Sequence, residues 1–143
     1  MSLATGRPAA LGIALLVLRL VIGSAFVLHG LPKVQHPFDW ADHIVPGTPP
    51  WLQLIAALAE FVGGIGLILG VLTRLCALFI ACNMIVAVFF VSVPHGAVFV
   101  ASKPHQGSFE LPLGYLAVMI ALVLAGPGRF SLDASLFRRR RRR

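Results

Sequence analysis

Charged residues are scarce in this chain, which argues against a soluble fold. Only 12% of its 143 residues are charged, 58% are apolar, and the mean hydropathy is +0.90. A membrane-spanning helix needs about 20 mostly apolar residues, and strand pairs are disfavoured because open sheet edges are not satisfied in hydrocarbon. The sequence predicts an all-α bundle of four transmembrane helices, a single membrane domain over residues 1–143, with helices at 9–31, 51–72, 75–93 and 109–126. A cleaved signal peptide is the alternative for the first run, but that run is long enough to span and Arg19 interrupts it.

Cysteine is also scarce, and its spacing excludes one redox mechanism. Cys76 and Cys82 are the only two cysteines, and there is no CxxC motif. Six residues apart in one predicted helix, they lie on different faces and about 9 Å apart along the axis, so they cannot form a disulfide with each other. The dithiol chemistry of four-helix quinone-linked oxidoreductases is therefore missing.

Metal-binding spacings are absent as well. All five histidines fall on one predicted side of the membrane without an HxxxH or HxxEH motif: His29, His36, His43, His95 and His105. No metal site is predicted. His29 and His95 end two helices at a similar depth, and that depth alone permits paired axial ligation of a haem, but nothing else in the chain supports a haem.

Positive charge is distributed unevenly between the predicted loops. With both termini inside, four arginine sites are internal and two lysines external: Arg7, Arg74, Arg129 and 138–143, against Lys33 and Lys103. The positive-inside rule predicts a bacterial inner-membrane protein with both termini cytoplasmic. The basic tail 129–143 is predicted to lie on anionic lipid headgroups, so the formal charge of +7 gives little support to nucleic-acid binding.

Two charged residues, Arg19 and Glu60, and one amide, Asn83, lie near the middle of the apolar runs. A charge at mid-bilayer costs about 3 kcal/mol, so such residues usually face a bundle interior and pair. Counted from the predicted helix starts, Arg19 and Glu60 each lie about 14 Å from a membrane edge. We expect them to form one interior polar site, with Asn83 facing the same interior. Two interpretations stay open: a structural clamp, or a site for a ligand, a quinone head or a proton.

The second helix is predicted to be the most enclosed. Glu60 shares its helical face with small or polar residues: Gln53, Ala56, Ala57, Gly63, Gly64 and Leu67. Small residues let helix backbones approach closely, and Gly66 with Gly70 adds a GxxxG spacing on an adjacent face.

Two further regions hold candidate site residues. Glu110 follows Ser108, a candidate N-cap, and opens the fourth helix. With His29 and His95, it is a candidate for the outer mouth of a cavity leading to Glu60. Residues 126–133 (GPGRFSLD) predict a helix stop and a turn, in which Arg129 and Asp133 contact each other and offer a docking point for a soluble partner.

Four sequence elements follow one another in order. They are residues 18–30 (LRLVIGSAFVLHG) followed by Lys33, residues 60–74 (EFVGGIGLILGVLTR), Asn83-Met84 with Ala87, and Glu110 with 126–133. Together they resemble the DoxX family of small four-helix membrane proteins, over about Leu18 to Asp133. By position, Arg19, Glu60, Glu110, Arg129 and Asp133 carry the family pattern. The resemblance implies membrane-linked redox or sulfur metabolism, since relatives are associated with a thiosulfate:quinone oxidoreductase and with oxidative-stress complexes.

The leading hypothesis is a membrane subunit or anchor of a quinone-linked or oxidative-stress redox system. It would act with a soluble or membrane oxidoreductase, with a quinone as the candidate cofactor, and whether the chain is itself an enzyme stays open. The first alternative is a small proton-coupled transporter, in one version a homo-oligomer, that uses Glu60 as its coupling carboxylate. The second is a non-catalytic scaffold whose charges only lock the bundle.

Overall fold

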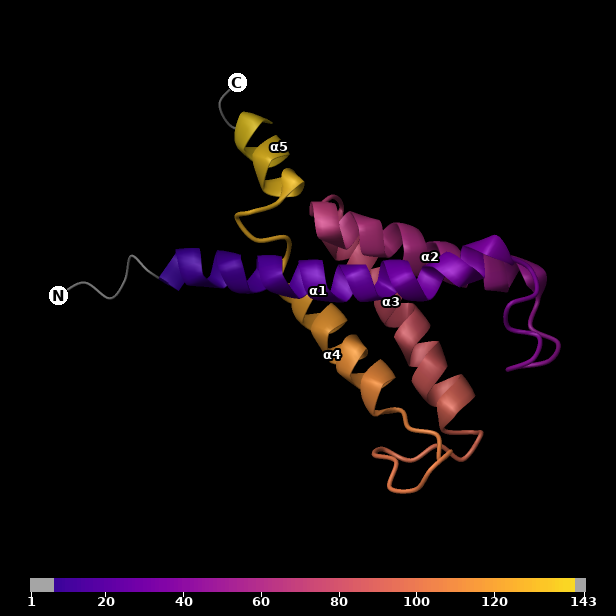
Figure 1. The fold of residues 1–143 in the computed structure, drawn as a ribbon. Coiled ribbons are helices and arrows are strands. Elements are labelled where there is room, and N and C mark those ends of the chain that lie inside the picture. The colour runs from indigo at the N-terminus through magenta and orange to yellow at the C-terminus, as the bar shows by residue number, and fades with distance from the viewer. Residues whose placement is uncertain (1–6, 141–143) are drawn as a thin grey trace.

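The chain folds into helices, as the composition predicts (Figure 1). The computed structural model describes the backbone of residues 7–140 and the side chains of residues 9–136. In chain order the helices are α1 (Arg7–Gln35), α2 (Pro50–Leu69), α3 (Thr73–Ile85), the π-helical continuation η1 (Val86–Ser92), α4 (Glu110–Ala125) and α5 (Leu132–Arg140). Within residues 7–140 the only β-type pairing is one isolated parallel bridge between Val98 and Ser108.

The apolar helices agree with the predicted spans, with differences at their ends. Three stretches are long and apolar enough to cross a membrane, and α4 is a shorter apolar helix: Ala9–Gln35, Pro50–Leu69, Thr73–Ser92 and Glu110–Ala125. α1 continues past its predicted end at residue 31, because Pro32 lies in the last turn and removes only one backbone hydrogen bond there. α5 occupies part of the segment that the sequence predicted as a turn and tail. The side chains of the terminal arginine run, 138–143, lie outside the described residues.

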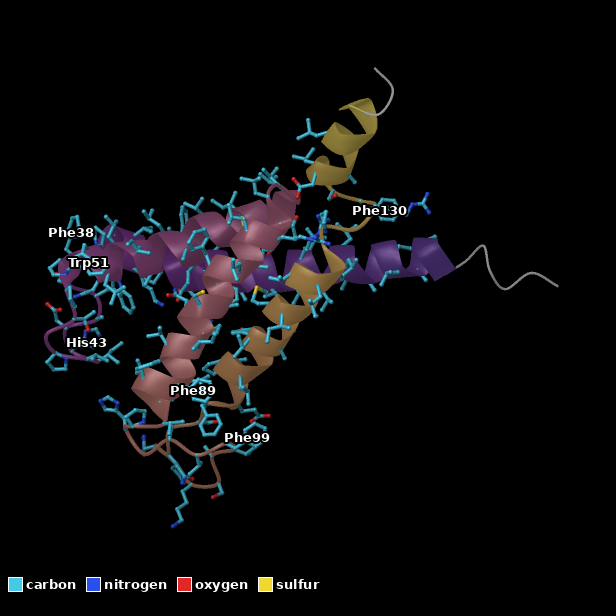
Figure 2. All side chains as sticks on the ribbon, turned by 180° about the vertical axis from the view of Figure 1, so that it is seen from behind. Phe38, His43, Trp51, Phe89, Phe99 and Phe130 are labelled. Atoms are coloured by element: carbon cyan, nitrogen blue, oxygen red, sulfur yellow. The ribbon has the colours of Figure 1, made fainter. Side chains whose placement is uncertain are left out.

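The helices are arranged as two antiparallel pairs (Figure 1). α1 lies along α2, and α3 lies along α4. The pairs meet where α2 turns into α3, where α4 ends and where α5 begins; we call this the α5 end. They diverge toward loops 36–49 and 93–109, which we call the loop end. Aromatic side chains gather at the loop end, among them Phe38, Trp51, Phe89 and Phe99 (Figure 2). All four are more than half exposed, as expected for side chains at a membrane interface.

α1 and α2 pack with their backbones in contact. A Cβ atom added at Gly64 would lie 2.8 Å from the backbone oxygen of Gly23, and one added at Gly30 would lie 2.6 Å from the backbone nitrogen of Phe61. Glycine therefore sets the distance and the register of this pair. The enclosed face predicted for α2 is confirmed, since its buried residues are Gln53, Ala57, Glu60, Gly63, Gly64 and Leu67.

The α2–α3 link is short, as the predicted helix bounds imply, but it lies at residues 70–72 rather than at 73–74. Gly70 ends α2 in the left-handed conformation, with φ +70°, and its N–H donates to the carbonyl of Gly66 at 2.9 Å. The N–H of Val71 donates to the same carbonyl at 3.0 Å, which satisfies the open end of the helix. Leu72 then adopts φ +47°, a conformation that costs a leucine about 1–2 kcal/mol. The tight reversal makes α2 and α3 antiparallel neighbours.

Candidate functional site

The predicted pair between Arg19 and Glu60 is wrong, because Glu60 pairs with Lys33. The Lys33 Nζ atom lies 2.6 Å from Oε1 of Glu60 and 2.7 Å from Oε2. Arg19 instead donates from Nη2 to the backbone carbonyl of Phe130, and a Cβ atom at Gly70 would overlap its guanidinium. Gly70 is ten residues from Glu60, or about 15 Å along α2. The two charges therefore lie about 15 Å apart along the α1–α2 pair.

Lys33 reaches Glu60 because α1 keeps one face against α2 from Arg19 to its last turn. Residues at helical spacing form this face, and all but the last are buried: Arg19, Gly23, Phe26, Gly30 and Lys33. The predicted helix ended at residue 31, so Lys33 was not expected to reach Glu60. The signal was present, since Lys33 continues the alternating spacing of three and four residues that begins at Arg19.

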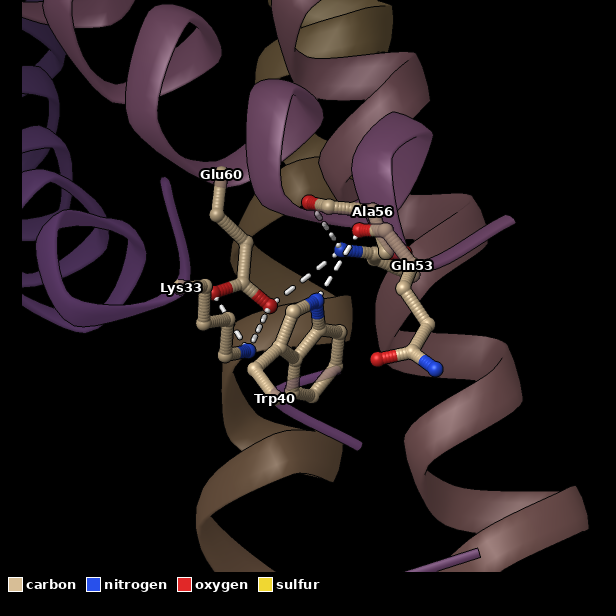
Figure 3. Close-up of polar contacts among 6 residues, drawn as sticks. Lys33, Trp40, Gln53, Ala56 and Glu60 are labelled. Carbon is tan, nitrogen blue, oxygen red and sulfur yellow. Dashed lines mark hydrogen bonds and ion pairs between the residues drawn. The ribbon is translucent and has the colours of Figure 1, made fainter. Parts of the chain in front are cut away.

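Glu60 is enclosed by groups from three helices (Figure 3). Its residue is 3% exposed, and Asn83 of α3 donates from Nδ2 to Glu60 Oε1 at 3.2 Å and to the carbonyl of Ala56 at 3.0 Å. Lys33 comes from α1 and Glu60 from α2. The structure thus brings Asn83 to Glu60, while Arg19 lies elsewhere. An ammonium and an amide thus supply hydrogen bonds to the oxygens of this buried carboxylate.

Loop 36–49 folds back over the pair through Trp40 and Gln53. The Lys33 Nζ atom lies 4.4 Å from the centroid of the Trp40 ring, within the range of a cation–π contact. Trp40 Nε1 donates to the backbone carbonyl of Gln53 at 3.0 Å. The buried Gln53 amide accepts from the Ala41 N–H at 2.8 Å and donates to the Asp42 carboxylate at 2.7 Å. These bonds fix the loop on the start of α2.

An open groove of about 420 Å³ lies beside Lys33. Its lining comes from the end of α1 and from loop 36–49: Pro32, Lys33, His36, Asp39, Trp40, His43 and Ile44. The Lys33 side chain is 24% exposed, whereas that of Glu60 is 5% exposed. Lys33 is therefore the group through which the buried carboxylate meets the groove. The groove combines a cation, an aromatic ring, two imidazoles and a carboxylate, which suits a flat ligand with polar acceptors.

The residues predicted at the outer mouth lie apart from this groove. The ring of His29 contacts Tyr115 of α4, with centroids 6.3 Å apart. His95 lies in the turn after η1, and its Nδ1 atom is 2.6 Å from the carbonyl of Val91 near the end of η1. Glu110 is exposed, and its N–H donates to Ser108 Oγ at 3.2 Å. None of the three lines the groove, and the part of the chain that is described holds no group of three acidic, histidine or cysteine side chains suited to a metal ion.

Asp133 is a backbone cap at the α5 end, so the predicted contact between Arg129 and Asp133 is wrong. Its carboxylate accepts the N–H groups of Leu72 at 2.9 Å and Thr73 at 3.0 Å, and its own N–H donates to the carbonyl of Gly70 at 2.9 Å. The N–H groups at the start of α3 lack acceptors within the helix, and the Asp133 carboxylate provides acceptors for two of them. Arg129 is exposed, and its side chain has no carboxylate within 4.0 Å among the described residues.

Comparison with known proteins agrees with this architecture. The family model for DoxX matches residues 14–93, a segment that contains Arg19, Lys33, Glu60 and Asn83. An uncharacterized protein of Haemophilus influenzae is 34% identical over 124 residues, covering 85% of this chain and 90% of the relative. A Bacillus subtilis protein named putative oxidoreductase CatD is 28% identical, covering 88% and 89%.

A third relative is named as a membrane protein. The Mycobacterium tuberculosis uncharacterized membrane protein Rv3486 is 28% identical over 141 residues, covering 88% of this chain and 83% of the relative. No solved structure matches the chain. A family match across the helices that hold the buried pair, together with apolar helices of spanning length, shows that this chain is a membrane protein of the DoxX family.

Proposed function

We propose that this chain is the membrane component of a quinone-linked redox system and that the groove beside Lys33 receives the quinone head. One observation carries the proposal: the Lys33 ammonium joins a buried carboxylate to an open groove at the loop end of the bundle. A charged group buried in a membrane helix is a functional-site candidate by default. Here Lys33 contacts the buried carboxylate of Glu60 and also lines the open groove.

The lining of the groove suits a quinone in its chemistry. A quinone head is a flat ring with carbonyl acceptors, and Lys33, His36 and His43 are side chains able to donate hydrogen bonds to such acceptors. Trp40 offers a ring for stacking. Pro32 and Ile44 are apolar neighbours for the start of the isoprenoid tail, and the loop end carries the exposed aromatic rings typical of a membrane interface.

The redox part of the proposal rests on the family and on one named relative. CatD of Bacillus subtilis is named a putative oxidoreductase. Reduction of a quinone takes two electrons and two protons. We assign the electrons to a partner oxidoreductase that docks on this chain and the protons to water that enters the open groove. The chain itself binds and orients the quinone.

We propose the bacterial inner membrane as its location, with the α5 end in the cytoplasm. The reported relatives are bacterial. Arg74 and Arg129 belong to the α5 end, and Lys33 and Lys103 belong to the loop end. The terminal arginine run, 138–143, begins within α5, which ends at Arg140. The positive-inside rule therefore favours this orientation.

Tryptophan fluorescence tests the binding directly, because the chain has only two tryptophans. In a Trp51→Phe background Trp40 is the sole tryptophan, so quenching by a short-chain ubiquinone in nanodiscs reports on the groove. We expect saturable quenching, and a Kd raised about tenfold or more by Lys33→Met, since a hydrogen bond from a charged donor contributes about 1.5–3 kcal/mol.

Lys103→Met is the matched control, because Lys103 is an exposed lysine in the other loop. It should leave the Kd unchanged. His36→Ala is the second groove variant and should weaken binding without touching Glu60. Linear, unsaturable quenching in the parent protein, or equal affinities in all four proteins, would overturn the quinone proposal.

A non-catalytic scaffold is the second candidate, and a separate observation favours it. Lys33, Glu60 and Asn83 link α1, α2 and α3 in one set of bonds. A clamp of this kind would hold the bundle without any ligand. A protein that binds no quinone yet loses its fold when this set is broken would be a scaffold.

A further inference from the structure

A second groove, of about 510 Å³, lies at the opposite end of the bundle. It is formed by the first half of α1, the turn after α4 and the start of α5, and its lining is Leu11, Gly12, Leu15, Ala125, Gly128, Arg129 and Ala134. Six of these seven residues are apolar or glycine, and Arg129 is the one that carries a charge. The groove lies where the apolar helix α4 ends, which is where lipid headgroups begin.

The turn that builds this groove is held close to α1. A Cβ atom at Gly128 would lie 3.2 Å from the Leu15 side chain, and one at Gly12 would lie 3.3 Å from the Phe130 ring. Gly128 has φ +75°, which suits glycine and reverses the chain after α4. Arg129 is therefore presented beside the groove by a defined turn.

Positive charge exceeds negative charge at the α5 end. The described side chains include three arginines there and one acid: Arg19, Arg74, Arg129 and Asp133. The Asp133 carboxylate already accepts two backbone N–H groups of the α2–α3 link. Arg19 is 1% exposed, and its Nε and Nη1 atoms have no hydrogen-bond partner among the described residues. One helical turn separates Arg19 from Leu15 in the groove wall, so its charge, which Asp133 opposes in part, adds to the field there.

From this geometry we propose that the groove binds the phosphodiester headgroup of an anionic phospholipid. The phosphate pairs with exposed Arg129, and the glycerol and first acyl carbons lie against Leu11, Leu15 and Ala125. A single cation in an apolar groove at a membrane edge matches a ligand that is anionic at one end and apolar at the other. A free phosphate would pair with Arg129 but would leave the apolar walls of the groove exposed to water.

Native mass spectrometry of the full chain in detergent micelles tests this site. The probes are dioleoylphosphatidylglycerol and dioleoylphosphatidylcholine, each titrated separately. We expect tighter binding of phosphatidylglycerol, and about a fivefold loss of that affinity in Arg129→Gln, which corresponds to about 1 kcal/mol per basic residue near the surface.

Arg74→Gln is the matched control, because it removes the same charge from the same end without lining the groove. It should keep the lipid preference, whereas an equal loss in both variants would mean diffuse attraction and would overturn the site. Ala134→Phe fills the groove and leaves every charge in place, so retained affinity in that variant would also overturn the proposal. Water-soluble glycerophosphoglycerol distinguishes the source: competition by the headgroup alone at equal concentration would reject a lipid ligand in favour of a free phosphodiester.

Discussion

The Nζ atom of Lys33 lies 2.6 Å from Oε1 of Glu60 and joins the last turn of α1 to the middle of α2. The two partners differ in their surroundings. Glu60 is buried and accepts a hydrogen bond from Asn83, whereas Lys33 is partly exposed and faces the groove and the Trp40 ring. Because of this difference, the loss of Lys33 and the loss of Glu60 should lower the stability of the protein by different amounts.

Lys33→Met should destabilise the protein more than Glu60→Gln. Loss of the ammonium leaves a buried carboxylate without its charge partner, at a cost of about 3 kcal/mol. Loss of the carboxylate leaves a lysine that still reaches water and the Trp40 ring, at a cost of about 1 kcal/mol. The double variant should be more stable than Lys33→Met alone. Thermal unfolding in detergent measures all three, and strictly additive effects would show that the two residues are not coupled.

Gly30→Ala should separate α1 from α2. Its new Cβ atom would lie 2.6 Å from the backbone nitrogen of Phe61, and such overpacking costs about 1–3 kcal/mol. Gly114→Ala in α4 is the control, because no atom lies within 4 Å of its new Cβ and alanine favours a helix over glycine by about 1 kcal/mol. The first variant should lower the melting temperature and the second should hold or raise it. The same decrease in both would contradict the close α1–α2 contact.

Asp133→Ala should loosen the α2–α3 link. The carboxylate accepts two backbone N–H groups, and the loss of a capping side chain costs about 1 kcal/mol. Asp133→Asn keeps one acceptor oxygen and should recover part of the stability. Hydrogen exchange at Leu72 and Thr73 reports the effect locally. Unchanged exchange of these two amides in the alanine variant would remove Asp133 from the role of cap.

Arg19→Met should release the chain segment that leads into α5. The guanidinium donates to the carbonyl of Phe130, and a bond from a charged donor contributes about 1.5–3 kcal/mol. We expect hydrogen exchange over 131–135 to rise about tenfold or more, while exchange in α2 near Glu60 stays constant. A matching rise around Glu60 would indicate that the two buried charges are coupled after all.

Local patterns in the sequence were sufficient to predict where the helices lie and which of their faces are buried. The buried face of α2 follows from the spacing of Gln53, Glu60 and Gly64, because a helix repeats every 3.6 residues whatever surrounds it. The short α2–α3 link was also predictable, since few residues separate two long apolar runs. The predicted end of α1 at residue 31 was too early. Pro32 lies in the last turn, where a proline removes one backbone hydrogen bond without ending the helix.

The sequence alone determined that this chain is a helical membrane protein with buried charges, since hydropathy and helical period are properties of single segments. Tertiary structure decided which charges meet. The approach of Gly23 to Gly64 sets the register of α1 on α2, and this register places Lys33 rather than Arg19 opposite Glu60. A contact between two backbones depends on both helices at once, so depth counted separately along each helix could not have found it.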